Sequence, residues 1–286
     1  MFVILGVSGH VGSVVAATLL DLNKPVRVVV RDAAKGEPWK ARGTEVAVAD
    51  VADAAAMTRA FTGATGAFVL LPPDLTTPDL LASNRARADS MAKAIKDAKV
   101  GHVVLLSSTG AQHETGTGPV RAVHYFEKVL GQTGAALTAV RAASFIENWL
   151  MSLSTLPQGF IPTFFPPDLA YPQVASRDIG KVVAAALVEG GRGRRVIDLA
   201  GPRPLSSNDV AAALSALTGK TIVAKQLPLD AVVPTYTSFG ISESVASNFR
   251  EMYEGSMRGL LAPVDPANVV RGTVTVEEVL RPHVKA

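Results

Sequence analysis

Three glycines near the amino terminus, Gly6, Gly9 and Gly12, recur at a spacing of three residues and would leave the backbone open to a bound anion. They lie in the stretch GVSGHVG, directly after an apolar run at residues 2–5 that is typical of a buried strand. The apolar residues that follow recur at helical spacing: Val11, Val15, Leu19 and Leu22. A strand-to-helix turn of this kind lets the backbone approach a pyrophosphate, and the N–H groups at the helix start hold the anion. The alternative is a glycine-rich turn without a ligand. The residues at the ends of the later strands are needed to distinguish the two interpretations.

The second predicted strand, residues 25–30, ends at a basic residue, Arg31, and Lys35 follows four positions later. In a dinucleotide site an acid at this strand end suits the ribose 2′-OH of NAD, whereas a basic residue suits the 2′-phosphate of NADP. We therefore expect NADPH or NADP in preference to NAD. Asp32 weakens the distinction because it lies close by, and both cations could instead be solvated loop charges.

Further strand patterns alternate with helical patterns along the first half of the chain, at residues 44–49, 67–71, 102–106 and 137–141. The polar, alanine-rich segment at residues 83–98 is predicted to be one of these helices. This alternation predicts an α/β fold: a Rossmann-like, doubly wound parallel sheet with helices on both faces. Ligands of such folds bind beyond the carboxyl ends of the strands. The segments that follow these strands are Asp50-Val51, Pro72-Pro73, SSTG and AASFIENW.

Two acidic residues after the third strand have local roles to consider. Asp53 is positioned to cap the helix that begins at Ala54. Asp50 could hydrogen-bond an adenine amino group or simply stabilise its turn, and the sequence favours neither role.

The character of the chain changes after Trp149. Prolines and aromatic residues become dense up to residue 172, which is typical of loops that line an apolar cleft. The same aromatic side chains could instead form the core of a small lobe. A helix pattern at 176–188 and a strand pattern at 194–200 then return to the sheet, and Ser206 or Ser207 is expected to cap the next helix.

These patterns divide the chain into two parts. Residues 1–150 are expected to form an NAD(P)-binding Rossmann-like domain, to which residues 177–200 return. Residues 151–176 and 201–286 are expected to form mainly a smaller C-terminal α+β lobe that binds the substrate.

Composition excludes several classes of function. The chain has 286 residues, 48% of them hydrophobic and 19% charged, which is the balance of an ordinary soluble globular protein. The net charge of +3 comes without any block of like charges, so no nucleic-acid partner is expected. The absence of cysteine excludes disulfides and thiolate chemistry and fits a cytoplasmic protein.

Neither a metal nor a membrane is expected. The five histidines show no paired spacing that would hold a metal ion. The apolar run before Gly6 is too short for a signal sequence or a membrane span. The sequence is compatible with a homodimer.

The order of several motifs makes a family resemblance specific. With GVSGHVG, Arg31 and SSTG come FEKVLGQTGAALTAVRAASFIENW at 126–149 and SRDIG at 176–180. In these motifs the chain resembles the NmrA-like branch of atypical short-chain dehydrogenases, and within it the NADPH-dependent quinone oxidoreductases and triphenylmethane dye reductases. The resemblance runs over nearly the whole chain. It implies a Rossmann-like domain that carries NADPH and a smaller lobe that closes over the nicotinamide.

Motifs and resemblance together define the expected cofactor contacts. These are the pyrophosphate loop, the 2′-phosphate contacts and the strand ends near adenine, ribose and nicotinamide: Gly6, Ser8, Gly9, His10, Val11, Gly12, Arg31, Lys35, Asp50, Val51, Leu71, Pro72, Ser107, Ala143, Ser144 and Phe145.

The chain departs from the family's usual catalytic pair. Standard short-chain dehydrogenases use a Tyr and a Lys four residues later, on one helix face, so that the Lys lowers the pKa of the phenol and the phenol passes a proton. Counted back from Glu127, these positions fall on Pro119 and Val123, and neither side chain can carry a proton. Relatives often place His or Lys at the second position, whereas here His124 is displaced by about 100° around the helix. His124 and Tyr125 are candidate donors, and a packing role is the alternative for His124.

The loss of this pair argues against alcohol dehydrogenase and epimerase activity, because an alkoxide product needs a positioned acid. Hydride addition to a quinone or a cationic dye gives a delocalised anion or a neutral leuco dye, so positioning of NADPH against a flat acceptor supplies most of the effect. We therefore expect a reductase of aromatic or quinone acceptors. The alternative is a non-catalytic NADP(H) sensor that changes partners with redox state.

The resemblance places Asn148, from the family's EN pair, near the substrate, and Asn148 and His124 are the candidate catalytic residues. The expected acceptor contacts are Thr109, Phe145, Asn148, Trp149, Phe164, Phe165 and Tyr171.

Overall fold

The computed structural model describes residues 1–284 and is built on an eight-stranded sheet. All paired strands of this sheet are parallel, in the order β12-β10-β6-β5-β4-β1-β2-β3. The strands are β1 (Phe2–Leu5), β2 (Val26–Val30), β3 (Glu45–Val48), β4 (Gly66–Val69), β5 (His102–Ser108), β6 (Ala136–Ala142), β10 (Arg194–Ala200) and β12 (Val270–Arg271). The order reverses direction between β1 and β4, which is the switch point where doubly wound folds bind ligands.

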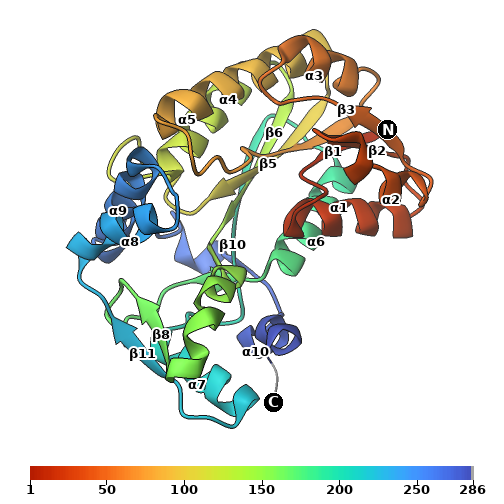
Figure 1. The fold of residues 1–286 in the computed structure, drawn as a ribbon. Helices are drawn as coiled ribbons and strands as arrows, with labels where there is room; N and C mark the ends of the chain where they lie inside the picture. The colour runs from red at the N-terminus through yellow and green to blue at the C-terminus, as the bar shows by residue number, and fades with distance from the viewer. Residues whose placement is uncertain (285–286) are drawn as a thin grey trace.

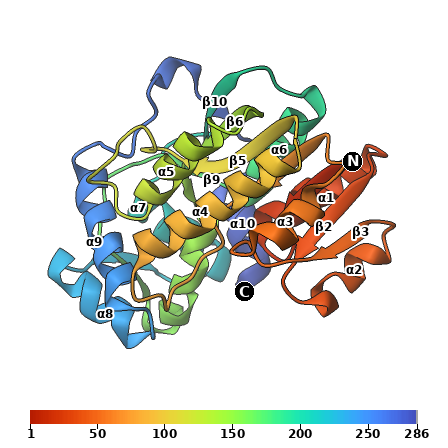
Figure 2. The same cartoon turned by 90° about the horizontal axis from the view of Figure 1, so that it is seen from above.

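Helices cover both faces of the sheet, as Figures 1 and 2 show. One face carries α1 (His10–Asp21) and α6 (Ser176–Glu189), and the other carries α3 (Ala54–Phe61), α4 (Leu80–Asp97) and α5 (Val120–Leu130). Each face has its own hydrophobic core because successive strand residues point in opposite directions. In β1, for example, Ile4 packs towards α1 and α6, and Val3 packs towards α3 and α4.

The second lobe lies beyond the carboxyl ends of the strands, at the end of the molecule away from the N-terminus (Figure 1). It contains η2 (Ile146–Gln158), β8 (Phe160–Thr163), α7 (Ser207–Thr218), β11 (Val223–Gln226), α8 (Val232–Ser238), α9 (Glu243–Met257) and α10 (Val276–Leu280). β8 and β11 pair in parallel, and a third hydrophobic core lies beneath them. The predicted α/β class with a smaller α+β lobe is confirmed.

Several element boundaries differ from the predictions for local reasons. β4 ends at Val69, so the residues at 70 and 71 already belong to the loop. α4 begins at Leu80, earlier than predicted, because the Asp79 carboxylate caps it. The region after Trp149 is not simply loop, since η2 and β8 occupy much of it.

The remaining helix starts agree with the predictions more closely. Asp53 caps α3, as predicted, and Ser206 caps α7 in a reciprocal capping box with Asp209. A strand that the sequence does not predict, β12, pairs with β10 at the edge of the sheet.

Across residues 1–284 no helix has both the length and the apolar character needed to cross a membrane. In the same range, no group of three or more His, Cys, Asp and Glu side chains could hold a metal ion.

Candidate functional site

The glycine turn joins β1 to α1 in a geometry that only glycine satisfies at two points. Gly6 has φ +71°, a left-handed conformation that costs glycine little, and its carbonyl accepts from the Gly9 N–H at 2.9 Å. A Cβ atom on Gly12 would collide with the backbone carbonyl groups of Gly6 and Leu5. The start of α1 therefore lies directly against the end of β1, as a pyrophosphate-binding turn requires.

The first turn of α1 leaves its N–H groups available to a ligand. Its N-cap, Gly9, offers no side-chain acceptor, and no acidic residue lies in the first turn. Among the described residues, no acceptor bonds the backbone N–H groups of His10, Val11 and Gly12. Ser8, Gly9 and His10 are exposed. These groups fit the pyrophosphate of a dinucleotide, because a bare helix start attracts an anion through its N–H groups and its dipole.

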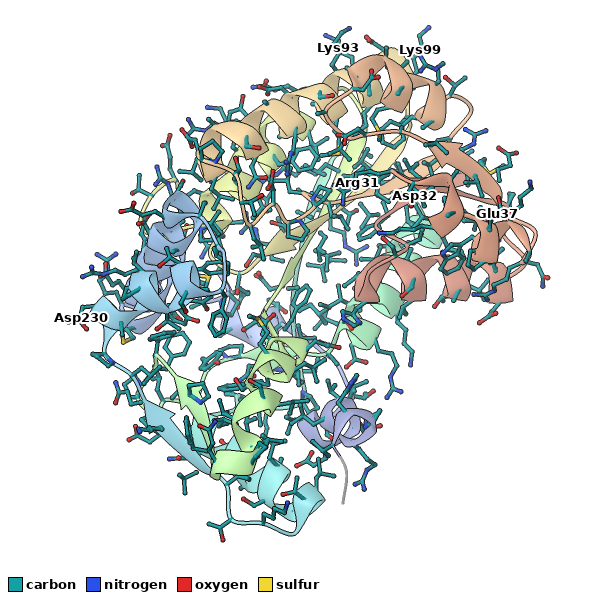
Figure 3. All side chains as sticks on the ribbon, in the orientation of Figure 1. Arg31, Asp32, Glu37, Lys93, Lys99 and Asp230 are labelled. Carbon is teal, nitrogen blue, oxygen red and sulfur yellow. The ribbon has the colours of Figure 1, made fainter. Side chains whose placement is uncertain are left out.

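The end of β2 presents a basic side chain beside a carboxylate that is already engaged. Figure 3 shows Arg31 and Asp32 next to each other there, with Glu37 at the outer edge of the molecule. The Asp32 carboxylate accepts from the Ala34 N–H at 3.0 Å and caps the short helix η1 (Ala33–Lys35). Arg31 and Lys35 are both exposed. The acid that weakened the cofactor prediction is thus used locally.

The Asp50 side chain makes the turn interaction that was one of its two predicted roles. Its Oδ1 accepts from the Ala52 N–H at 2.8 Å, while the adjacent Val51 is buried. This bond leaves the second carboxylate oxygen for another donor, so an adenine contact stays a prediction.

A cavity of about 180 Å³ opens between the end of β4, the start of α5 and α9. Leu71 and Pro72 line it from the β4 side, and Pro119 and Val123 line it from the α5 side. Asp74 also lines the cavity but forms an ion pair with Arg87, which lowers the pKa of the Asp74 carboxyl through its hydrogen bond. The two positions that the sequence compares with a Tyr-Lys pair therefore face the same space as the β4 end.

The Ser107 hydroxyl does not point into a free site. It donates to the Glu127 carboxylate at 2.6 Å, and the Arg141 guanidinium holds the same carboxylate at 2.8 and 2.9 Å. Burial alone would raise the pKa of Glu127, but the hydrogen bonds from Arg141 and Ser107 outweigh it and lower that pKa. The donor of the Ser107 hydroxyl is therefore occupied, and only its acceptor lone pairs and the backbone are left for the ribose contact, which stays a prediction.

The two candidate donors on α5 are both engaged elsewhere. His124 Nδ1 lies 2.9 Å from the Ala111 carbonyl, to which it donates, so only Nε2 is left for a ligand. Tyr125 points towards α4, where its hydroxyl donates to Asp89 at 2.8 Å. The alternative packing role thus describes the observed contact of His124, and the position of Tyr125 removes it from the candidates.

A second cavity, of about 170 Å³, lies beyond the ends of β5 and β10. Thr109 lines it, buried and fixed by a 3.0 Å bond from its N–H to the Ala142 carbonyl, together with Pro172 and Asp198. Asp198 has a buried Oδ1 without a hydrogen-bond partner within residues 1–284. Burial raises the pKa of Asp198, and the nearby Arg141 offsets part of this effect.

The residues after β6 differ in exposure, although the sequence predicts that they contact the ligand together. Ala143 is buried, Ser144 is exposed, and Phe145 is half-buried in the short strand β7 (Ser144–Phe145), which pairs with β9 (Gln173–Val174). Asn148 is exposed in η2, and its side chain has no hydrogen-bond partner within residues 1–284.

Trp149 differs from its neighbours. It is buried in the core of the second lobe, and its indole N–H donates to the Gln173 side chain at 2.8 Å. Its polar atom is already satisfied within the core, which corrects the prediction of an acceptor contact in favour of the packing alternative.

Aromatic residues of the second lobe do meet, but the group is larger than the sequence predicts. Phe165 packs on Tyr171, with ring centroids 4.7 Å apart. Three further rings that the sequence analysis missed complete the cluster: Tyr236, Phe249 and Tyr253. The spacing of four residues between Val245, Phe249 and Tyr253 is a signal that could have identified one inward face of α9.

Known proteins resemble this chain over almost its full length. The sequence model of the NmrA-like family matches residues 1–277. The NAD(P)H azoreductase of Xenophilus azovorans is 29% identical over 276 residues, which cover 96% of this chain and 91% of the azoreductase.

Two solved structures share the fold. An NADPH-dependent quinone oxidoreductase from Escherichia coli, complexed with NADPH, matches with a TM-score of 0.83 and 23% identity over 98% of each chain. The triphenylmethane reductase of Citrobacter sp., complexed with NADP(H), matches with a TM-score of 0.85 and 18% identity, over 99% of this chain and all of that chain.

Proposed function

This chain belongs to the NmrA-like family, and we propose that it is an NADPH-dependent reductase that transfers hydride to a flat apolar acceptor, such as a quinone or a dye. The reaction uses no Tyr-Lys pair. The names of an azoreductase relative and of two structural neighbours, a quinone oxidoreductase and a triphenylmethane reductase, support this acceptor class.

One observation carries the proposal. The bare first turn of α1 lies at the switch point of the sheet, and the nearby cavity at the β4 end is lined by Pro119 and Val123 instead of proton-carrying side chains. Such a site can hold a dinucleotide and an apolar acceptor together, but α5 supplies no acid for an alkoxide. Acceptors whose reduced form is delocalised fit these restrictions.

NADPH, when bound, supplies the hydride from C4 of its nicotinamide. The chain's own residues position the cofactor and select the acceptor. The α1 turn holds the pyrophosphate, Arg31 and Lys35 attract the 2′-phosphate, and Leu71 and Pro72 lie against the ribose side of the site. Arg31 is suited to a phosphate because its planar guanidinium can donate two parallel hydrogen bonds. The apolar walls at Pro119 and Val123 exclude water from the acceptor.

The test is NADPH consumption, followed by absorbance, with a panel of simple quinones, an azo dye and a triphenylmethane dye. We expect saturable, acceptor-dependent oxidation that is faster with NADPH than with NADH. Tight NADPH binding without oxidation in the presence of any acceptor would contradict the reductase. That outcome would favour the NADP(H) sensor. A sensor needs no proton-carrying side chains at positions 119 and 123, so Pro119 and Val123 are compatible with it.

A further inference from the structure

The second lobe contains a continuous chain of six aromatic rings. Phe165 packs on Tyr171 and, edge-on, on Tyr253 at 5.0 Å, and Tyr253 packs in turn on Phe164 at 5.2 Å. Tyr236 continues the chain: it lies 6.1 Å from Phe164 and stacks on Phe249 at 5.0 Å with an interplanar angle of 10°. The rings come from the β8 end, the β9 side, α8 and α9, so four separated segments build one surface.

One end of the aromatic chain lines a cavity at the strand ends, and the other end lies next to a residue that lines the second cavity. Phe249 lines the cavity that also contains Leu71 and Pro72. At the other end, Tyr171 immediately precedes Pro172, which lines the second cavity with Thr109. The aromatic chain therefore extends from the cavity at the β4 end towards the cavity that Thr109 lines.

Within this apolar surface two hydroxyl groups are paired. The Tyr236 and Tyr253 oxygens lie 2.9 Å apart, and neither has another hydrogen-bond partner within residues 1–284. Each phenol has one hydrogen, and the bond between them uses only one. One O–H of the pair is therefore left to donate to a third group.

We propose that Tyr253 is the residue that hydrogen-bonds the acceptor, that Tyr236 is the residue that positions it, and that the acceptor is a planar aromatic molecule with a carbonyl or azo lone pair. This inference deepens the proposed function and rests on it. The Tyr236 O–H donates to the Tyr253 oxygen, and the Tyr253 O–H donates to the acceptor.

The ring contacts assign the two roles. Tyr236 lies between Phe249 and Phe164, which hold its plane. Tyr253 contacts both Phe164 and Phe165 and lies at the centre of the ring chain, so a flat molecule that entered here would meet aromatic rings. Both tyrosine residues are half-buried.

The electrostatic environment keeps this donor protonated. Burial raises the pKa of Tyr253 well above its ordinary value, and it also raises that of Tyr236. Each phenol is therefore uncharged near pH 7, and its O–H can donate a hydrogen bond to a lone pair.

The overall step balances with one hydride and one proton. The nicotinamide supplies a hydride, which carries two electrons and one proton, and NADPH becomes NADP+. A quinone takes up the hydride and one proton from water across its conjugated system and becomes a hydroquinone, whereas an azo compound takes them up across its N=N bond and becomes a hydrazo compound. When the reduced acceptor is a strong base, as a reduced azo nitrogen is, the Tyr253 O–H transfers that proton and water reprotonates the phenol.

The test measures binding in the presence of NADP+, which cannot reduce the acceptor. Isothermal titration compares menadione, which is a naphthoquinone, with naphthalene, which has the rings but no carbonyl. We expect Tyr253→Phe to weaken menadione binding about fivefold to tenfold and to leave naphthalene binding unchanged. Tyr236→Phe should weaken menadione binding less, and the double variant should resemble Tyr253→Phe because the two hydroxyls act in series.

Tyr125→Phe is the matched control, since it removes a tyrosine hydroxyl that bonds Asp89 on the far side of α5. Thermal unfolding of every variant checks that it is folded. Equal weakening of both probes in Tyr253→Phe would assign the residue to packing and overturn the inference. An unchanged menadione affinity, or no menadione binding by the wild type, would also overturn it.

Failure of the proposed function gives a different result. In that case the hydroxyl-dependent binding of menadione would persist, but NADPH would not be consumed.

Discussion

Helices α1 and α6 lie side by side on one face of the sheet, yet their amino termini are completed in opposite ways. Their contact is close, because a Cβ on Gly180 would meet the Val14 side chain. In α6 the Glu147 carboxylate accepts from the Ser176 N–H at 2.9 and 3.1 Å and also from its hydroxyl. In α1 the N-cap is Gly9, which provides no acceptor.

The difference separates a structural helix start from a binding one. Every helix has N–H groups in its first turn without a partner inside the helix, and these groups favour negative charge. At α6 the chain provides the charge itself. Under the proposed function, a bound phosphate would provide the charge at α1, so the absence of a cap would be part of the site.

The largest expected effect comes from closing the space between the α1 turn and β1. Gly12→Val adds a branched side chain where even a Cβ atom meets the Gly6 carbonyl group. We expect the free energy of unfolding to fall by about 3 kcal/mol, which is the upper range for overpacking, and NADPH binding to be lost. Urea unfolding and fluorescence titration measure the two effects.

Gly9→Ala is the control for this variant. A Cβ on Gly9 lies 3.4 Å from the Gly6 oxygen, so the fold should tolerate it. If both variants unfolded equally easily, the close approach at Gly12 would not be the determining feature.

The second largest effect is expected when α1 is given an internal anion like that of α6. Gly9 has an extended backbone, φ −108° and ψ 178°, which an aspartate N-cap adopts without strain. Gly9→Asp should keep or raise the stability, while its carboxylate competes with the pyrophosphate and weakens NADPH binding by about a hundredfold. Gly9→Asn, a neutral cap, should weaken binding less. Unchanged NADPH affinity in Gly9→Asp would show that the α1 start does not bind the phosphates.

Removing the internal anion of α6 should give the reverse pattern. Glu147→Ala leaves the Ser176 N–H without its charged acceptor, and we expect the free energy of unfolding to fall by about 2 kcal/mol. NADPH affinity should change less than in Gly9→Asp. Glu147→Gln, which keeps an acceptor oxygen but no charge, should lose about half as much stability. Equal stability of all three proteins in urea would refute a structural role for this carboxylate.

Arg31 extends the anion site of α1 beyond the helix. Arg31→Ala should weaken NADPH binding about tenfold, the range for a charged hydrogen bond to phosphate, and should leave NADH binding nearly unchanged. Lys24→Ala, at a half-buried position before β2, is a matched loss of positive charge. Equal weakening of NADPH and NADH would assign Arg31 a general electrostatic effect instead of 2′-phosphate recognition.

The smallest effect concerns a third helix start, α7, whose cap depends on pH. The Ser206 hydroxyl and N–H, followed by Arg203, lower the pKa of Asp209 to about 2. An unfolded aspartate titrates near about 3.9, so this stabilisation is present above about pH 4 and is lost as the pH falls towards the folded value. Asp209→Asn should cost about 1 kcal/mol at neutral pH and nearly nothing in strong acid. A pH-independent difference in urea unfolding would contradict the charge argument.

Much of this protein is determined by local sequence. Alternation of apolar strands with helical stripes was sufficient for the parallel sheet, and the glycine spacing located the turn at Gly6 and Gly12, because periodicity and backbone freedom act between near neighbours. Asp53 was recognised as a helix cap for the same reason. The boundaries that failed, such as the start of α4 at Leu80, depended on a cap one residue away that the apolar pattern does not reveal.

Which polar groups are free for a ligand depends on the packing of elements that are distant in the sequence. Ser107 and Trp149 look available in the sequence, but Glu127 and Gln173 occupy their donors in the fold. The sequence gives Tyr253 no special role, whereas in the fold it lies next to Tyr236 and Phe165. A hydrogen bond depends on a distance of about 3 Å between atoms that the chain separates by many residues, so it is determined by how the elements pack and not by the pattern within any one of them.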